Sequence, residues 1–344
     1  MRDPLRGHLS YFITQPCAVV AIYARFLMSF VASNGYGGAM NLIKEHLGDI
    51  FALATALSWA LGVIWFRKSQ GHFSAPALNF FKNIVGIVLL TITIVATGRW
   101  DALDLEPEAI ALMVASGALG IGVADTMFFE CLERLGASRT AVVECLYSPV
   151  VILFSGIFLE EVMGLSLLMG CGLIVGSIIL VERGRKTDGV EEHTRSRAEL
   201  TQGLALGIAS MLFMGLAVVL VKPVIERADL LWSTELRLLG GILGGVVYSG
   251  WRKEVRGAWR ASLRPSVGWK YAIPGAFVGT YLSLIFWLGG FKYGDASSAA
   301  ALNQTSTVFT VILAALILKE KVGFSQWIAI SLGFLGSLIV VSSG

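Results

Sequence analysis

Residues 132–164 read LERLGASRTAVVECLYSPVVILFSGIFLEEVMG, and residues 291–323 repeat the pattern as FKYGDASSAAALNQTSTVFTVILAALILKEKVG. In both stretches a long apolar run follows an Ala-Ser pair and leads to a glutamate three residues before a glycine. A shift of 159 residues places Glu161 on Glu320. Self-similarity at a long, fixed distance indicates that the chain contains two related halves.

The opening part of each half repeats at 155 residues instead of 159. At this shift Gly48 falls on Gly203, and Lys82 falls on Arg237. One insertion in the polar segment 251–270 accounts for the difference. Matched cations inside apolar runs are harder to obtain by chance than matched leucines, so they carry the argument for a repeat.

The composition indicates a membrane protein. Hydrophobic residues make up 55% of the 344 residues and charged residues only 15%, with a mean hydropathy of +0.72, whereas soluble domains are about a quarter charged. Helices need about 20 apolar residues to cross a bilayer, and they satisfy their own backbone hydrogen bonds. The long runs differ from the short alternating strands of a β-barrel. We predict an all-α polytopic membrane protein of about ten transmembrane helices, at residues 48–66, 74–97, 109–130, 137–158, 162–181, 201–221, 231–250, 269–290, 296–318 and 324–342.

The predicted spans divide the chain into four parts. These are an N-terminal extension at 1–47, a first five-helix repeat at 48–181, a polar linker at 182–200 and a second five-helix repeat at 201–342. The linker is rich in charged residues and has no apolar period. A second polar segment, 251–270, is rich in arginine and tryptophan, so we expect it to lie along the membrane interface.

The N-terminal extension allows two interpretations. Its moderately apolar stretch, Tyr11 to Ala32, is interrupted by Pro16 and Arg25 and fits a cleavable signal peptide poorly. In one interpretation the extension is not part of the functional chain, which starts at Met40; in the other it forms an additional span. The first predicts that a chain starting at Met40 inserts and transports as well as the full chain.

Each half contains five spans, which is an odd number. The second half therefore enters the membrane in the opposite direction from the first. Inverted repeats of this kind place the substrate site near the midplane, between the halves. We predict that a rotation about an axis in the membrane plane superimposes Lys82 on Arg237 and Glu144 on Asn303.

The chain resembles the drug/metabolite transporter superfamily, specifically its EamA type with two five-helix repeats. The resemblance covers about residues 45–342 and rests on Trp59 in ALSWALGVIW, on the cations of PALNFFKN and STELRLLGG, and on the two stretches quoted above. It implies a cell-membrane transporter that moves amino acids, related metabolites or drug-like molecules, often outward. It also implies a structural role at a helix N-terminus for Glu161 and Glu320. In the second half Met214 aligns with Trp59, so the halves are not expected to contribute equally.

Two cations lie inside predicted spans. An intramembrane charge costs about 2.5–3.5 kcal/mol on insertion scales, so Lys82 and Arg237 each need an explanation. In one interpretation their side chains extend to the near interface. In the other they face a central cavity and hold an anionic group.

Small polar residues follow one helical face on the fourth and ninth spans, where they either border one cavity or join helices by hydrogen bonds. They are Glu144, Ser148 and Ser155 on the fourth span, and Asn303, Thr307 and Thr310 on the ninth. Glu144 is the most informative of them because it lies about a turn and a half of helix beyond the Ala-Ser turn. It could pair with Lys82, bind a substrate amine or carry a coupling proton.

Ten residues are candidates for a substrate-binding cavity. They combine intramembrane charges, the polar faces and aromatic residues that form cavity walls or pack helices: Trp59, Lys82, Asp125, Glu144, Tyr147, Ser148, Arg237, Tyr281, Asn303 and Thr307. The sequence shows no nucleophile constellation, phosphate loop or metal-ligand spacing. A net charge of +3 gives no support for nucleic-acid binding. No catalytic residue, metal or cofactor is therefore predicted.

These observations predict a secondary transporter that works by alternating access around a midplane cavity, and the resemblance implies that it exports a small metabolite. Its partners are the small-molecule substrate, the lipid bilayer and, as one alternative, a coupling proton. Two other classes stay open. A membrane-embedded enzyme would need clustered His or Asp residues at one membrane face, and a non-transporting membrane subunit would need a partner. The sequence predicts no oligomeric state.

Two arguments about membrane orientation disagree. The side with the loops after the first, third, fifth, seventh and ninth spans carries 17 of the 27 Lys and Arg residues, and the other side carries 8 at most. Positive residues in short loops stay cytoplasmic, so this count places the linker inside and the C-terminus outside. The resemblance implies the opposite, with both termini cytoplasmic.

Overall fold

The computed structural model describes residues 46–160, 196–251, 258–320 and 322–341, together with short pieces of 169–180. Nearly all of the predicted N-terminal extension, most of the fifth predicted span and most of the linker lie outside the described residues. Glu161 lies outside them too. The helices below belong to one compact unit, Gly48–Gly344.

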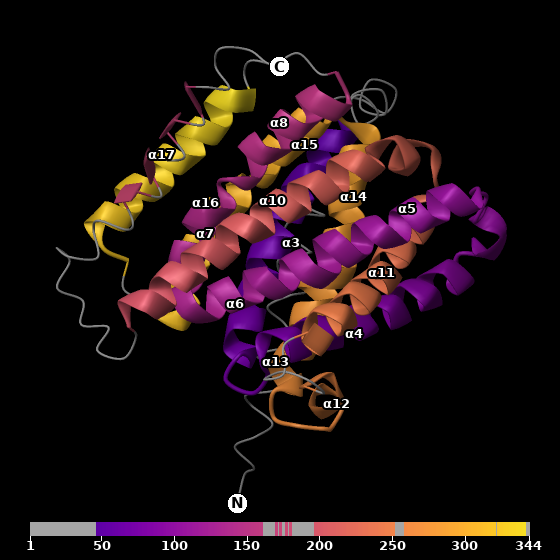
Figure 1. Ribbon diagram of the computed structural model, residues 1–344, viewed down its shortest axis with the longest axis horizontal. Coiled ribbons are helices and arrows are strands. Elements are labelled where there is room, and N and C mark those ends of the chain that lie inside the picture. Colours follow the sequence, from indigo (N-terminus) through magenta and orange to yellow (C-terminus); the bar gives the residue numbers. More distant parts are fainter. Residues whose placement is uncertain are drawn as a thin grey trace, which may run out of the picture. The chain divides into compact units, whose positions relative to one another are not determined.

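Every regular element among the described residues is helical (Figure 1). The first half contains α3 (Leu47–Ser69), α4 (Ala75–Ala96), the short η1 (Trp100–Ala102), α5 (Pro107–Gly117), η2 (Ala118–Ala124), α6 (Asp125–Leu135), α7 (Ala137–Glu144) and α8 (Tyr147–Phe158). Here α5, η2 and α6 form one continuous span, as do α7 and α8.

The second half follows the same order. It contains α10 (Arg197–Arg227), α11 (Leu230–Trp251), α12 (Ala258–Ser262), α13 (Trp269–Ala276), η4 (Phe277–Leu282), α14 (Ser283–Tyr293), α15 (Ala296–Asn303), α16 (Thr305–Leu313), η5 (Ala314–Leu318) and α17 (Phe324–Val341). Across the described residues, eight helical stretches are long and apolar enough to cross a membrane. These eight and α17 lie at nine of the ten predicted spans.

The start of α10 corrects the predicted end of the linker. The helix begins at Arg197, not at residue 201, because Ser196 and Glu199 form a capping box. The Ser196 hydroxyl accepts the backbone N–H of Glu199 at 3.2 Å, and the Glu199 carboxylate accepts the N–H of Ser196 at 3.0 Å. Two otherwise unpaired backbone donors are thus satisfied four residues before the apolar run begins.

Irregular turns recur at the repeat distance of 159 residues. The wide π-helical turn η2 has a counterpart in η4, at the same place in the eighth span. The fourth span is interrupted at Cys145 and Leu146, and the ninth at Gln304. Glu160 and Lys319 both adopt positive φ angles, 58° and 56°. Hydropathy alone does not encode these details, so their recurrence supports the repeat independently of the residue matches.

The contacts between helices show that the two halves are inverted. A Cβ on Gly62 would lie 2.4 Å from the Cα of Gly279, and one on Gly48 would lie 2.7 Å from Gly294. The helix α3 therefore runs antiparallel to the eighth span. Consecutive spans joined by short loops alternate in direction, so α3 is parallel to the third span. The eighth span consequently runs opposite to its counterpart.

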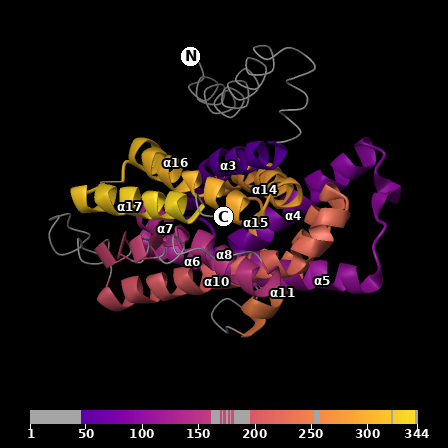
Figure 2. The same ribbon diagram turned by 90° about the horizontal axis from the view of Figure 1, so that it is seen from above.

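The contact between α10 and the third span supports the same inversion. Gly203 of α10 approaches Leu135, and Gly120 of η2 approaches Ala217, so α10 runs antiparallel to the third span. Figures 1 and 2 both show α10 beside α6. The first helix of each half thus packs on the third span of the other half. This exchange holds the halves together along the cavity described below.

A glutamate of the second half caps a helix of the first. The Glu320 carboxylate accepts hydrogen bonds from the backbone N–H groups of Ala137 and Ser138, both at 3.0 Å, and from the Ser138 hydroxyl at 2.7 Å. These groups form the N-terminus of α7, where the helix dipole favours an anion. The structural role expected for Glu320 is confirmed.

Candidate functional site: a charged cavity lined by both halves

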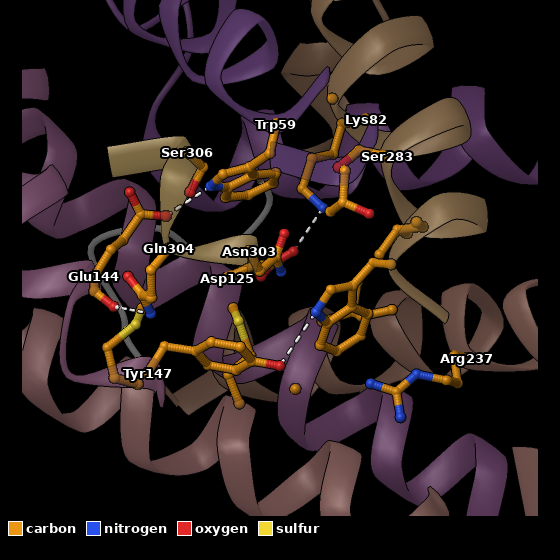
Figure 3. A pocket seen from close by; sticks show the side chains of 18 residues that line it. Trp59, Lys82, Asp125, Glu144, Tyr147, Arg237, Ser283, Asn303, Gln304 and Ser306 are labelled. Atoms are coloured by element: carbon orange, nitrogen blue, oxygen red, sulfur yellow. Dashed lines mark hydrogen bonds and ion pairs between the residues drawn. The ribbon is translucent and has the colours of Figure 1, made fainter. Parts of the chain in front are cut away.

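A cavity is lined by side chains of both halves (Figure 3). Seven of the ten candidate residues line it: Trp59, Lys82, Asp125, Glu144, Tyr147, Arg237 and Asn303. The helix interruptions position three of these residues, because Glu144 and Tyr147 flank the interruption of the fourth span. Asn303 directly precedes the interruption of the ninth span. Gly120 of η2 and Gly279 of η4 also line the cavity.

Lys82 forms a buried ion pair within the first half. Its Nζ lies 2.7 Å from Oδ2 of Asp125 and also donates to Oδ1 of Asn83 at 2.9 Å. The Lys82 side chain is only 2% exposed. Extension of Lys82 to the interface is therefore wrong, and so is its pairing with Glu144. Asp125 is the nearer acid because the third span packs beside α4.

Glu144 is held by a neighbouring aromatic residue. The Trp59 indole Nε1 donates to Oε1 of Glu144 at 2.6 Å, and the Gln304 amide donates to the Glu144 backbone carbonyl at 3.1 Å. The other carboxylate oxygen, Oε2, is buried and has no hydrogen-bond partner. One half of the carboxylate is thus fixed and the other half is free.

Arg237 is fully buried, so its extension to the interface is also wrong. Its Nη1 donates to the hydroxyl of Ser116, and its guanidinium carbon lies 5.4 Å from the ring centre of Trp287. The Nε and Nη2 groups have no hydrogen-bond partner. A cation over an aromatic face is stabilised electrostatically, but its unpaired N–H groups still lack an acceptor.

Comparison with known proteins identifies the family. The chain matches the EamA-like transporter family twice, over residues 46–183 and again over residues 201–342. The chain belongs to this family. As an EamA-like protein it is a multi-pass transporter of the cell membrane, not an enzyme.

The relatives agree with this assignment. The chain is 30% identical over 159 residues to the uncharacterized transporter YvbV of Bacillus subtilis, a match that covers 46% of this chain and about half (51%) of that protein. It is 21% identical over 276 residues to an uncharacterized transporter of Archaeoglobus fulgidus, covering 80% of this chain and 91% of that one. A solved structure titled "Crystal structure of protein" shares the fold, with a TM-score of 0.63 at 14% identity, covering 86% of this chain and 96% of that chain.

Three candidate residues do not line the cavity of this EamA-like transporter. Ser148 and Thr307 are buried on other faces of their helices, and Thr307 accepts a weak hydrogen bond from the Cys145 thiol at 3.8 Å. A regular helix would have kept them on the face of Glu144 and Asn303, but each helix is interrupted between the two positions. Tyr281 contacts the Thr93 hydroxyl at 2.7 Å instead.

One interruption also explains two of the four polar cavity residues that the sequence interpretation missed, whereas the other two, Thr55 and Ser283, lie in α3 and α14. Gln304 and Ser306 line the cavity because the chain turns between α15 and α16. The signal available in the sequence was the run Asn-Gln-Thr-Ser at residues 303–306, since four polar residues in succession do not fit one face of a helix. Among the described residues, no group of three or more His, Cys, Asp or Glu residues could hold a metal ion.

Proposed function

We propose that this membrane transporter is a secondary transporter that exports a small metabolite by alternating access around the cavity. The observation that carries the proposal is the set of charged side chains from both halves, buried around one space: Lys82, Asp125, Glu144 and Arg237. Burying charges away from water and lipid is costly, so their concentration in a cavity indicates a polar cargo. Export is the direction that the resemblance implies.

The irregular helices support alternating access. Four spans depart from regular α-helix where they border the cavity, at η2, at η4, and at the interruptions beside Glu144 and Gln304. Broken helices supply binding groups in transporters built from inverted repeats, and such points also absorb the dihedral changes of a hinge. We propose that the two halves rock about these four points.

The lining of the cavity supports a small organic solute, because ligand pockets for small molecules are mostly apolar and carry a few placed polar groups. Its walls combine apolar side chains, such as Met211, Met214 and Leu284, with the charged groups. This combination fits a metabolite with an apolar body and few charges.

Purified protein in liposomes tests the proposal. We expect it to move at least one solute of a metabolite library across the vesicle membrane, without chemical change and without another protein. Protein-free liposomes are the control, and a counterflow measurement with vesicles of known protein orientation gives the direction. A folded protein that moves no solute in the library would favour a non-transporting subunit.

A further inference from the structure

The two cavity charges that lack partners lie on different halves and have opposite signs. Lys82 and Asp125 neutralise each other at 2.7 Å, which leaves Glu144 and Arg237. Among the described ion pairs, none joins either residue to an opposite charge. The repeat explains why Arg237 is unpaired: Asp125, the partner of Lys82, falls on Leu284 in the second half.

The free atoms of Arg237 form one edge of the guanidinium group. Nη1 donates its hydrogen bond to the Ser116 hydroxyl. The Nε–H group and the Nη2 N–H group on the same edge have no acceptor and are available to a ligand. These two parallel donors match the two oxygens of a carboxylate. Trp287 covers one face of the guanidinium group at 5.4 Å, and the free edge carries the two donors.

The free oxygen of Glu144 provides the complementary group. Trp59 fixes Oε1 at 2.6 Å, while Oε2 is buried without a hydrogen-bond partner. A carboxylate oxygen in this position is an acceptor for a substrate ammonium, which supplies several N–H donors. The amide oxygen of Asn303, also without a partner, is a second acceptor in the cavity.

Two aromatic side chains separate these sites. Tyr147 follows Glu144 across the helix interruption, and its hydroxyl accepts a hydrogen bond from Trp287 Nε1 at 3.1 Å. Trp287 in turn covers Arg237. Figure 3 shows Glu144 and Arg237 on opposite sides of the cavity, with Tyr147 placed between them. A ligand that reaches both charges must extend past these rings.

We propose that the solute carries an amine at one end and a carboxylate at the other, with an apolar body between them. Glu144 binds the amine, Arg237 binds the carboxylate through its Nε–Nη2 edge, and Tyr147 and Trp287 contact the body. The proposal rests on the transport function proposed above and names its substrate class. An α-amino acid carries both charges on one carbon, so on this proposal it binds less tightly than a solute whose charges lie at opposite ends.

Calorimetric titration of the purified protein with simple probes tests this class. The probes are 6-aminohexanoate and 8-aminooctanoate, with leucine, hexylamine and hexanoate as comparisons. At least one ω-amino acid should bind on the order of tenfold to a hundredfold more tightly than each comparison, because each added charged hydrogen bond contributes that much. Leucine binding as tightly as the best ω-amino acid would overturn the proposal.

Variants assign the two ends. In Arg237→Gln the ω-amino acid should lose its preference over hexylamine, and in Glu144→Gln it should lose its preference over hexanoate. Arg237→Lys keeps the positive charge but lacks the two parallel N–H donors, so it should retain part of the preference for the ω-amino acid over hexylamine. Glu235→Gln is the matched control, because Glu235 is a buried carboxylate outside the cavity lining. Preferences that survive both substitutions would overturn the assignment.

The design separates this proposal from the transport function. Each preference is a ratio of affinities within one preparation, so a smaller folded fraction does not change it. Solute flux in liposomes without binding of any ω-amino acid would overturn the substrate class and leave the transport function intact. Tight binding of the ω-amino acids without flux of any solute would overturn the transport function instead.

Discussion

At the scale of single residues, Lys82 and Asp125 show how this chain keeps charge away from lipid. Both side chains are nearly inaccessible, and their charged atoms lie 2.7 Å apart. The sequence made both residues candidates for a cavity, because an unexplained intramembrane charge is costly, and left extension of Lys82 to the interface as the alternative. It did not predict that they pair, since the partner depends on which helices are neighbours.

We expect Asp125→Asn to lower the stability of the folded protein by about 3–5 kcal/mol, because it leaves the Lys82 ammonium buried without a counter-ion. The measurement is the midpoint of thermal unfolding of the detergent-purified variant. The double variant Lys82→Met, Asp125→Met removes both charges and should recover most of the loss. An unchanged midpoint in Asp125→Asn would show that the ion pair does not stabilise the fold.

We expect Glu144→Gln to reduce transport by about tenfold or more, since the amide loses one charged hydrogen bond to the substrate. A proton on Glu144 would compete with a bound amine, so wild-type transport should fall at acid pH and the variant should lose this dependence. Liposome flux at several pH values measures both effects. Glu235→Gln should behave as wild type, because Glu235 bonds Thr91 at 2.8 Å and is not among the residues that line the cavity. Full, pH-dependent activity in Glu144→Gln would reduce Glu144 to a packing role.

At the scale of helices, the positions of the spans could be predicted and their internal irregularities could not. An apolar run indicates a length that crosses a bilayer, and η2 (ALGIGVA) is itself such a run, so its hydropathy does not distinguish it from a regular α-helix. The prediction therefore assumed 3.6 residues per turn throughout. That assumption placed Ser148 and Thr307 on the cavity face, and the interruptions before them turn these side chains elsewhere.

Glycines set how closely the helices approach. The helix α11 contains four glycines, Gly240, Gly241, Gly244 and Gly245, and three of the four are in tight contact. A Cβ on Gly244 would lie 2.2 Å from the carbonyl oxygen of Ala118, in η2. A Cβ on Gly245 would meet no other atom within 4 Å. The two neighbours therefore form a matched pair for substitution.

We expect Gly244→Ala to destabilise the protein by about 1–3 kcal/mol, because α11 and η2 must separate to admit the methyl group. Gly245→Ala should be neutral or slightly stabilising, since alanine favours a helix over glycine. Thermal unfolding in detergent measures both. Equal midpoints for the two variants would mean that the close contact between α11 and η2 does not limit the packing.

At the scale of the whole molecule, the odd number of spans in each half predicted the inversion, and the antiparallel glycine contacts confirm it. The halves are nevertheless chemically different around the cavity. Asp125 falls on Leu284, Glu144 on Asn303 and Trp59 on Met214. Under the proposed alternating access, the backbone symmetry would provide two equivalent access states. The asymmetric side chains would give the proposed solute two chemically distinct ends of the cavity.

The orientation in the membrane is the remaining prediction at this scale. The loops after the odd-numbered spans carry 17 Lys and Arg residues, against 8 at most on the other side, so we predict that α12 faces the cytoplasm.

Two exposed residues test this orientation. Arg260 on α12 and Asp101 after α4 lie on opposite sides of the membrane if the predicted spans are correct. Each is replaced by cysteine in a chain without its native cysteines, and intact cells are treated with a membrane-impermeant maleimide. Asp101→Cys should react in intact cells, and Arg260→Cys only after lysis. The reverse pattern would show that both termini are cytoplasmic, as the resemblance implies, and that the charge difference between the two sides does not determine orientation in this inverted repeat.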